Sequence, residues 1–280
     1  MTKEDGAKGL NKLQRSELEN AITKVYEDYK TPRLSNLKSI LLDHEDPQMV
    51  KLGKILSIWC GETPYGRFLD KPTTVEMSNS TICFDLKGLE QYEDLQQACL
   101  LMISDMVVRS VQNDKTRMKF LVFDECWRLL EDGEGANFIG SIFRTCRKYF
   151  MSCIAISQNI DDFALSPVAK AIMSNSSIKW VLKQKGADKD RLAETLELNE
   201  SEVDLISSLH QERGVYSEAF LICEDNRAVV AVESTPPEYW LATTDPRDIS
   251  ELEKQKKLNP ELSREQLILH LADKYPNGTV

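Results

Sequence analysis

Long apolar runs, paired cysteines and clustered histidines are all missing from this sequence. The longest apolar stretch, residues 98–103, is far shorter than the about 20 residues that cross a bilayer. The first residues hold no apolar segment of a signal peptide. None of the 7 cysteines forms a C-x-x-C pair, and the 3 histidines are scattered. These absences argue against a zinc site or a disulfide framework, and they predict buried, reduced thiols in a cytoplasmic protein.

The composition is that of a globular protein with an acidic surface. Hydrophobic residues make up 41% of the 280 residues and charged residues 29%, which excludes wholesale disorder and collagen. The 35 basic and 45 acidic side chains give a net charge of −10. Because nucleic acids are held by neutralising phosphates with Lys and Arg, this balance does not support direct nucleic-acid binding, although a local basic groove stays open.

The pattern along the chain changes near residue 80. Before it, helices are expected over 16–31, where Ser16 and Glu19 form a capping box, and over 34–42 and 49–59. After it, strands and helices alternate. Strands are expected over 81–86, 119–123, 153–157 and 178–183, helices over 95–111, 137–150 and 203–209, and a hairpin over 216–222 and 228–233. The helix over 95–111 is apolar on nearly every face and is expected to be largely buried. A last helix is expected to begin after Ser263.

This alternation predicts an α/β fold with a mostly parallel sheet that is covered by helices on both faces. We expect three parts: a helical subdomain over residues 1–79, an α/β core over 80–235 and a helical tail over 236–280.

The strongest chemical signal is FLVFDE, an apolar strand that ends in Asp124 and Glu125. Strand ends of open α/β sheets are where ligands bind. Nucleotide hydrolases place such a pair there, so that Asp124 holds Mg²⁺ through its water shell and Glu125 polarises the attacking water. The alternative interpretation is that one of the two acids only caps the following helix.

Two further features accompany this pair. Gln158 follows the next expected strand, where its amide can sense a γ-phosphate or orient water, although it can also simply begin a loop. Arg144 and Arg147 lie three residues apart in FRTCRKY, on the helical face opposite the apolar stripe. Such a face is usually only solvated, but in ring-shaped nucleotide hydrolases these arginines reach a neighbouring subunit's phosphates.

A phosphate-binding loop is missing. None of the 12 glycines begins the pattern G-x-x-x-x-G-K-[ST], and Gly53-Lys54 continues with Ile55. The sequence therefore has the acidic half of a nucleotide site without its phosphate half. We expect these residues alone neither to bind ATP tightly nor to hydrolyse it.

Five blocks occur in a familiar order: FDLKGLE, LVFDECWRLLED, FRTCRKY, AISQNIDDF and PPEYWLATT. Over residues 16–274 the chain resembles the C-terminal ATPase domain of conjugative type IV secretion ATPases of the TraC/VirB kind. The resemblance implies a RecA-like P-loop fold, with residues before about 80 as its helical insertion. It also implies Asp124 and Glu125 as the acidic pair, Gln158 as the sensor, and Arg144 with Arg147 as the arginine motif.

The resemblance further implies Mg²⁺-dependent ATP hydrolysis by a hexamer at the cytoplasmic face of the inner membrane. This activity would drive substrate transfer and pilus assembly together with other secretion subunits and the coupling protein. The family carries its phosphate loop upstream of the helical insertion, and this sequence starts after that point. Two alternatives stay open: a hexameric DNA translocase with the same core, and an interaction module without catalysis.

Overall fold

The computed structural model describes residues 10–76, 78–89, 91–113, 115–125, 133–164, 167–184, 186 and 188–279. The chain divides into two compact units, residues 1–114 and 115–280. The domain boundaries expected after residues 79 and 235 remain predictions.

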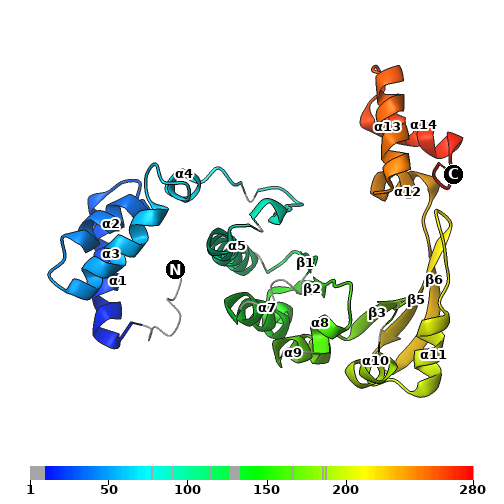
Figure 1. Ribbon diagram of the computed structural model, residues 1–280, viewed down its shortest axis with the longest axis horizontal. Helices are drawn as coiled ribbons and strands as arrows, with labels where there is room; N and C mark the ends of the chain where they lie inside the picture. Colours follow the sequence, from blue (N-terminus) through cyan, green and yellow to red (C-terminus); the bar gives the residue numbers. More distant parts are fainter. Residues whose placement is uncertain are drawn as a thin grey trace. The chain divides into compact units, whose positions relative to one another are not determined.

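The first unit is helical (Figure 1). Its elements are α1 (Lys12–Asp28), α2 (Leu34–Leu42), α3 (Pro47–Leu56), η1 (Ser57–Trp59), α4 (Gly66–Leu69), η2 (Lys87–Leu89) and α5 (Glu93–Asn113). Buried Leu41, Met49 and Trp59 lie at the centre of its core. The expected start of the first helix is wrong, because Asn11 and Gln14 form the capping box five residues before Ser16 and Glu19. Leu10, just before this cap, packs against the same core and thereby favours the earlier start.

Two other expectations for this unit are wrong. Residues 81–86 form no strand in the structure, and Cys83 within them is exposed rather than buried. An extended segment becomes a strand only when a neighbour pairs with its backbone, and periodicity cannot supply that neighbour. Helix α5 is not largely buried, since the side chains of Leu101 and Met102 are exposed.

The second unit begins with two parallel strands, β1 (Lys119–Phe123) and β2 (Met151–Ala155). The helix α7 (Gly133–Thr145) and the 3₁₀ turn η3 (Cys146–Tyr149) connect them. Phe123 meets the rings of Phe138 and Phe143 of α7, with centroids 6.2 and 6.4 Å apart. The sheet therefore buries one face against α7, which is one of the two faces that the strand pattern predicted to be covered by helices.

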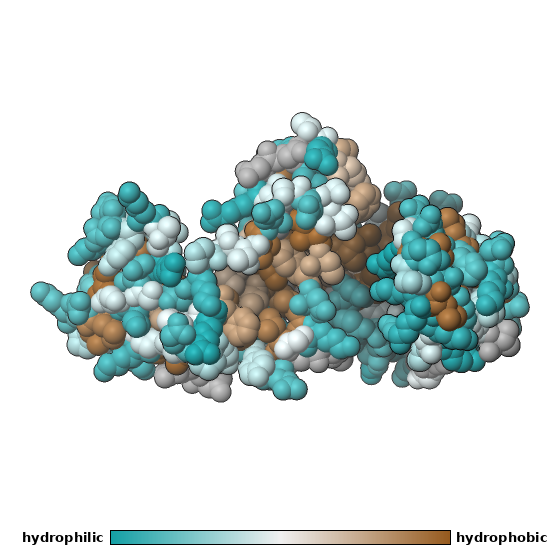
Figure 2. Space-filling view, turned by 90° about the horizontal axis from the view of Figure 1, so that it is seen from above, coloured by the Kyte–Doolittle hydropathy of each residue, from teal (hydrophilic) through white to brown (hydrophobic). Residues whose placement is uncertain are grey.

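The opposite face of these two strands carries exposed apolar side chains. Phe120 is 68% exposed, and Val122 and Ile154 are also exposed. Figure 2 shows apolar side chains at the surface in the middle of the view. Within the described residues, no helix is both long enough and apolar enough to cross a membrane.

The remaining strands form an antiparallel sheet: β3 (Ile178–Leu182), β4 (Gln211–Glu212), β5 (Tyr216–Cys223) and β6 (Asn226–Glu233). The expected β5–β6 hairpin is confirmed, with a turn at Glu224 and Asp225. Antiparallel pairing is more extensive than expected, because β5 returns beside β3 and pairs with it from Ala219 to Cys223.

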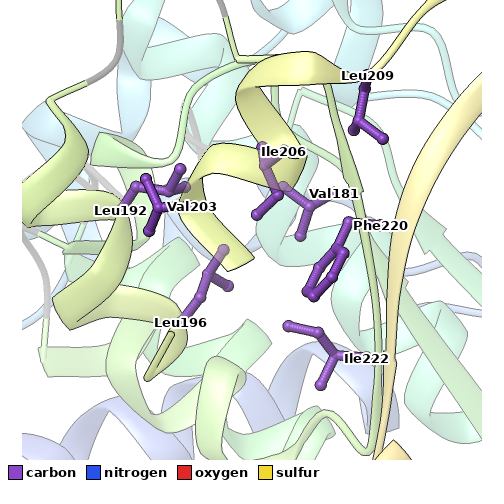
Figure 3. Packing of buried hydrophobic residues seen from close by; sticks show 8 residues of the cluster. All are labelled: Val181, Leu192, Leu196, Val203, Ile206, Leu209, Phe220 and Ile222. Carbon is purple, nitrogen blue, oxygen red and sulfur yellow. The ribbon is translucent and has the colours of Figure 1, made fainter. Parts of the chain in front are cut away.

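Four helices accompany this sheet: α8 (Asp161–Ala164), α9 (Pro167–Asn175), α10 (Lys189–Leu196) and α11 (Glu200–Ser208). As Figure 3 shows, apolar side chains of α10 and α11 meet those of β3 and β5 in one core; these are Val181, Leu192, Leu196, Val203, Ile206, Leu209, Phe220 and Ile222. This core fixes α10 against the sheet.

Three helices end the second unit: α12 (Pro236–Ala242), α13 (Pro246–Leu258) and α14 (Arg264–Lys274). The capping box at Ser263 is confirmed, with Gln266 as its partner. Buried Trp240 donates from Nε1 to the carbonyl oxygen of Tyr275 over 2.7 Å and packs against Leu271. These contacts join α12 to α14.

A buried carboxylate, Asp248 at the start of α13, connects this helical module to the sheet. Its Oδ2 accepts hydrogen bonds from Arg213 Nη2, Tyr239 Oη and Thr243 Oγ1, at 3.0, 2.6 and 3.0 Å. Its Oδ1 accepts from the backbone nitrogen and hydroxyl of Thr279, at 2.7 and 2.6 Å. Arg213 lies beside β4, so a single carboxylate joins the β4–β5 turn, two helices and the last described residue.

Candidate functional site

Strands β1 and β2 end at the same edge of their sheet. Phe123 lies opposite Ala155 in the register, and the backbone nitrogen of Ile156 donates to the Phe123 carbonyl over 2.9 Å. The residues that follow each strand are therefore neighbours. Across this edge, Gln158 Nε2 donates a hydrogen bond to Glu125 Oε1. The structure thus brings together two side chains that lie 33 residues apart.

The backbone turns sharply at the acidic pair. Glu125 has a φ of 52°, in the left-handed region that non-glycine side chains seldom occupy, and its nitrogen donates to Asp124 Oδ1 over 3.1 Å. A non-glycine residue in this conformation costs about 1–2 kcal/mol and is common where a side chain must be aimed for function. The competing hypothesis, that one acid caps the next helix, depends on residues 126–132, which lie outside the described residues.

The loop after β2 holds contacts that the sequence analysis missed. Ser157 Oγ donates to Asp162 Oδ2 across the loop. The preceding residue, Asp161, forms an ion pair with Arg191 Nη1 of α10 over 2.8 Å. Nothing in the local pattern indicated either contact, because Ser157 and Asp162 are five residues apart and Arg191 lies in a separate helix.

The two arginines of FRTCRKY are both exposed. The single helix expected over 137–150 is wrong, because α7 begins at Gly133 and ends at Thr145, and Arg147 belongs to the 3₁₀ turn η3. A 3₁₀ turn rotates by a larger angle per residue than an α-helix, so the shared α-helical face of Arg144 and Arg147 is not retained. Their catalytic role stays a prediction.

Three thiols of the chain are poor nucleophiles. Burial and the neighbouring Cys146 raise the pKa of the Cys153 thiol to about 12. Burial also raises the pKa of Cys60 and of Cys99. The six cysteines among the described residues are all free, and only Cys83 among them is exposed. The raised pKa values of Cys60, Cys99 and Cys153 favour a packing role over a chemical one for these three thiols.

The carboxylates at the strand ends suit magnesium that arrives with a phosphate ligand. Among the described side chains, no three His, Cys, Asp or Glu residues form a metal-binding group. Mg²⁺ does not require one, since it commonly keeps several waters and takes one or two carboxylates together with substrate phosphates. Asp124 is an exposed carboxylate at the correct edge and fits this mode of binding.

Comparison with known proteins agrees with this geometry. Residues 10–274 match the family model of the TraG P-loop domain. The chain belongs to this family. It is 32% identical to protein TraC of Escherichia coli (strain K12) over 141 residues, which cover 46% of this chain and 16% of TraC. The expected relationship to ATPases of the TraC/VirB kind is thereby confirmed.

A solved structure, VirB4 of Thermoanaerobacter pseudethanolicus, matches the fold with a TM-score of 0.65 and 24% sequence identity. The match covers 82% of this chain and 66% of that one, so the chain spans only part of its relatives. The expected RecA-like α/β fold is confirmed by this likeness.

Proposed function

We propose that this chain supplies the carboxylate half of a Mg-ATP hydrolysis site in a type IV secretion ATPase. The observation that carries the proposal is the hydrogen bond from Gln158 to Glu125 across adjacent strand ends. A strand-end acid paired with a sensor amide is the arrangement that nucleotide hydrolysis requires. The match to the TraG P-loop domain family supports the same class of reaction.

In this proposal Glu125 is the group that accepts a hydrogen bond from the attacking water. A carboxylate has two oxygens with about four acceptor positions, so Glu125 can accept the bond from Gln158 at Oε1 together with bonds from other donors. That bond also fixes the direction in which the carboxylate faces. A polarised water would then attack the γ-phosphorus, the bond from that phosphorus to the bridging oxygen of ADP would break, and Glu125 would accept the proton that the water loses.

Gln158 and Asp124 have separate parts in the same site. The Gln158 amide carries a second N–H and an acceptor oxygen, with which it can contact the γ-phosphate or the water. Asp124 would hold Mg²⁺ through a water ligand, and the ion would neutralise charge on the phosphates when ATP is bound. Both assignments follow from the position of these side chains at the sheet edge.

The phosphate half must come from elsewhere, since these 280 residues contain no G-x-x-x-x-G-K-[ST] segment. Such a loop supplies backbone N–H groups and a lysine. No other pattern in the sequence provides an equivalent phosphate-binding motif. We infer that hydrolysis needs this segment together with a phosphate-binding loop, in a ring in which Arg147, and with it Arg144, reaches the neighbouring subunit's ATP.

The proposed cellular role is inferred from the related proteins. We propose that the hexamer acts at the cytoplasmic face of the inner membrane, with other secretion subunits and the coupling protein, in substrate transfer and pilus assembly. The similarity to TraC supports this assignment. The net charge of −10 favours it over a DNA translocase.

The acidic pair provides the test, in a protein that carries this segment together with its phosphate loop. Glu125→Gln should keep Mg-ATP bound but slow hydrolysis by at least about a hundredfold, because only the water-polarising group is lost. Asp124→Ala should instead weaken Mg-ATP binding. If both variants only lower the melting temperature and keep full turnover, the acids cap a helix and the chain is an interaction module.

A further inference from the structure

The loop that carries Gln158 is anchored on both sides of that residue. Before it, Ser157 leaves β2 and donates its hydroxyl to Asp162 Oδ2. After it, Ile160 packs against the apolar core of the antiparallel sheet. Next to Ile160, Asp161 Oδ1 binds Arg191 Nη1 at 2.8 Å. The loop is therefore held by a hydrogen bond within it and by an ion pair to α10.

Backbone hydrogen bonds tighten the same loop. The nitrogen of Asp162 donates to the carbonyl of Asn159 over 3.3 Å, and that of Phe163 donates to Ile160 over 3.0 Å. The hydroxyl-to-carboxylate bond closes the loop around Gln158 and Asn159. A long, exposed side chain such as glutamine otherwise samples many rotamers, and ordering it costs conformational entropy. A closed loop reduces the backbone part of that freedom.

We propose that Asp162 and Arg191 are positioning residues that hold Gln158 in reach of Glu125. The proposal rests on the proposed role of Gln158 in hydrolysis. Asp162 acts through Ser157 on the near side of the loop, and Arg191 acts through Asp161 on the far side. Helix α10 packs in the core of the antiparallel sheet. The loop that carries the Gln158 amide is therefore fixed both to that sheet, through α10, and to β2.

If the ion pair between Asp161 and Arg191 only stabilised the fold, its removal would lower the melting temperature. The ion pair between Asp161 and Arg191 is exposed, with side chains 36% and 45% accessible. Exposed ion pairs contribute little to folding stability, because water and ions screen them. Removing Arg191 should therefore leave the melting temperature almost unchanged, so any displacement of Gln158 reports on positioning.

The first experiment follows the side-chain amide of Gln158 by NMR in the 280-residue chain. Its signals are assigned by their loss in Gln158→Glu. In Asp162→Ala and Arg191→Ala, the two N–H signals should move toward free-glutamine shifts and exchange faster with water. Asp162→Asn keeps an acceptor oxygen for Ser157 and should retain the original signals. Lys189→Ala is the matched control, because it removes another exposed ion pair of α10, the 2.8 Å pair with Asp204, without touching the loop.

The second experiment measures ATP turnover in a protein that carries this segment with its phosphate loop. Asp162→Ala and Arg191→Ala should each lower kcat about tenfold at unchanged KM for ATP, less than the hundredfold loss that a 1 Å misplacement can cause. Asp162→Asn should recover most of the rate, and Lys189→Ala should not change it.

The two experiments separate the two claims. Unmoved Gln158 signals in both Asp162→Ala and Arg191→Ala overturn the positioning role, whatever the rates. Displaced signals with an unchanged kcat keep the positioning role and overturn the catalytic role of Gln158. Should Asp162→Ala fail to fold, Arg191→Ala decides alone, because its contact is exposed and dispensable for folding.

Discussion

Replacing the buried carboxylate of Asp248 should loosen the C-terminal helical module. The residue is 0% exposed and accepts five hydrogen bonds, three at Oδ2 and two at Oδ1. In Asp248→Asn only one of the two positions keeps an acceptor oxygen. If the amide group faces Thr279, it meets a backbone N–H that cannot turn away. If it faces the other side, Arg213 loses its partner there.

The expected cost can be worked out from these contacts. A hydrogen bond to a charged group contributes about 1.5–3 kcal/mol, and an unpaired buried donor costs about 1–3 kcal/mol. Arg213 keeps a second partner, Asp245, at 3.1 Å, which lowers the loss on that side. The hydroxyls of Tyr239 and Thr243 can rotate to accept. We therefore expect a loss of about 2–4 kcal/mol for the module.

Hydrogen exchange over residues 236–279 measures this loss locally, which suits a chain of two units better than a global melting curve. Fluorescence of Trp240, buried beside Tyr239, provides an independent signal. Asp273→Asn is the matched control, because it makes the same charge change at an exposed position of α14. A loss below about 0.5 kcal/mol in Asp248→Asn, equal to that of the control, would refute the reasoning.

The pH dependence of the module has a defined sign. Burial acts to raise the pKa of Asp248, but hydrogen bonds from Thr279, Tyr239 and Thr243 outweigh it and hold the pKa well below its ordinary value. The charged carboxylate therefore stabilises the folded module above the unfolded pKa of about 3.9. That contribution should disappear as the pH falls below about 4, and Asp248→Asn should remove most of this acid sensitivity.

Three further outcomes are expected. The 280-residue chain alone should show no micromolar heat of binding with Mg-ATP in calorimetric titration; micromolar binding with turnover that Glu125→Gln abolishes would reveal a phosphate site absent from the sequence patterns. In a ring whose subunits carry the phosphate loop, Arg147→Ala should stop hydrolysis at nearly unchanged ATP affinity, and mixing it with Asp124→Ala subunits should restore some activity. Inactive mixtures of assembled rings, or full activity of Arg147→Ala, would remove the trans role. Ile206→Ala, at a fully buried position, should cost about 2–5 kcal/mol in denaturant unfolding of the second unit, whereas a cost near zero would contradict the packing in Figure 3.

Sequence reasoning worked best where the signal was local. The run KFLVF gave β1 its bounds, and Ser263 with Gln266 gave the start of α14, because apolar runs and caps act within a few residues. The meeting of Glu125 and Gln158 was also within reach, since parallel strands place their carboxyl ends together. It failed where a partner elsewhere decides: residues 81–86 lack a paired neighbour in the structure, although their alternation resembles a strand.

The contacts that were missed share a physical property. Asp161 with Arg191 and Asp248 with Thr279 join segments 30 and 31 residues apart. Their side chains meet only because several elements pack first, and no periodicity records that meeting. The early start of α1 was missed for a related reason, since two capping patterns compete there and the packing of Leu10 decides between them.

The position of Thr279 determines when the C-terminal helical module can close during synthesis. Thr279 follows Asp248 by 31 residues, which a ribosome adds in about 2–6 s at 5–20 residues per second. During that interval the carboxylate has the donors of Arg213, Tyr239 and Thr243 but not the two that bind Oδ1. In the same way, the Trp240 Nε1 donor lacks its acceptor until Tyr275 has been added. The module of α12, α13 and α14 therefore cannot close before Thr279 has been added, and a chaperone or protease can reach its open form during that interval.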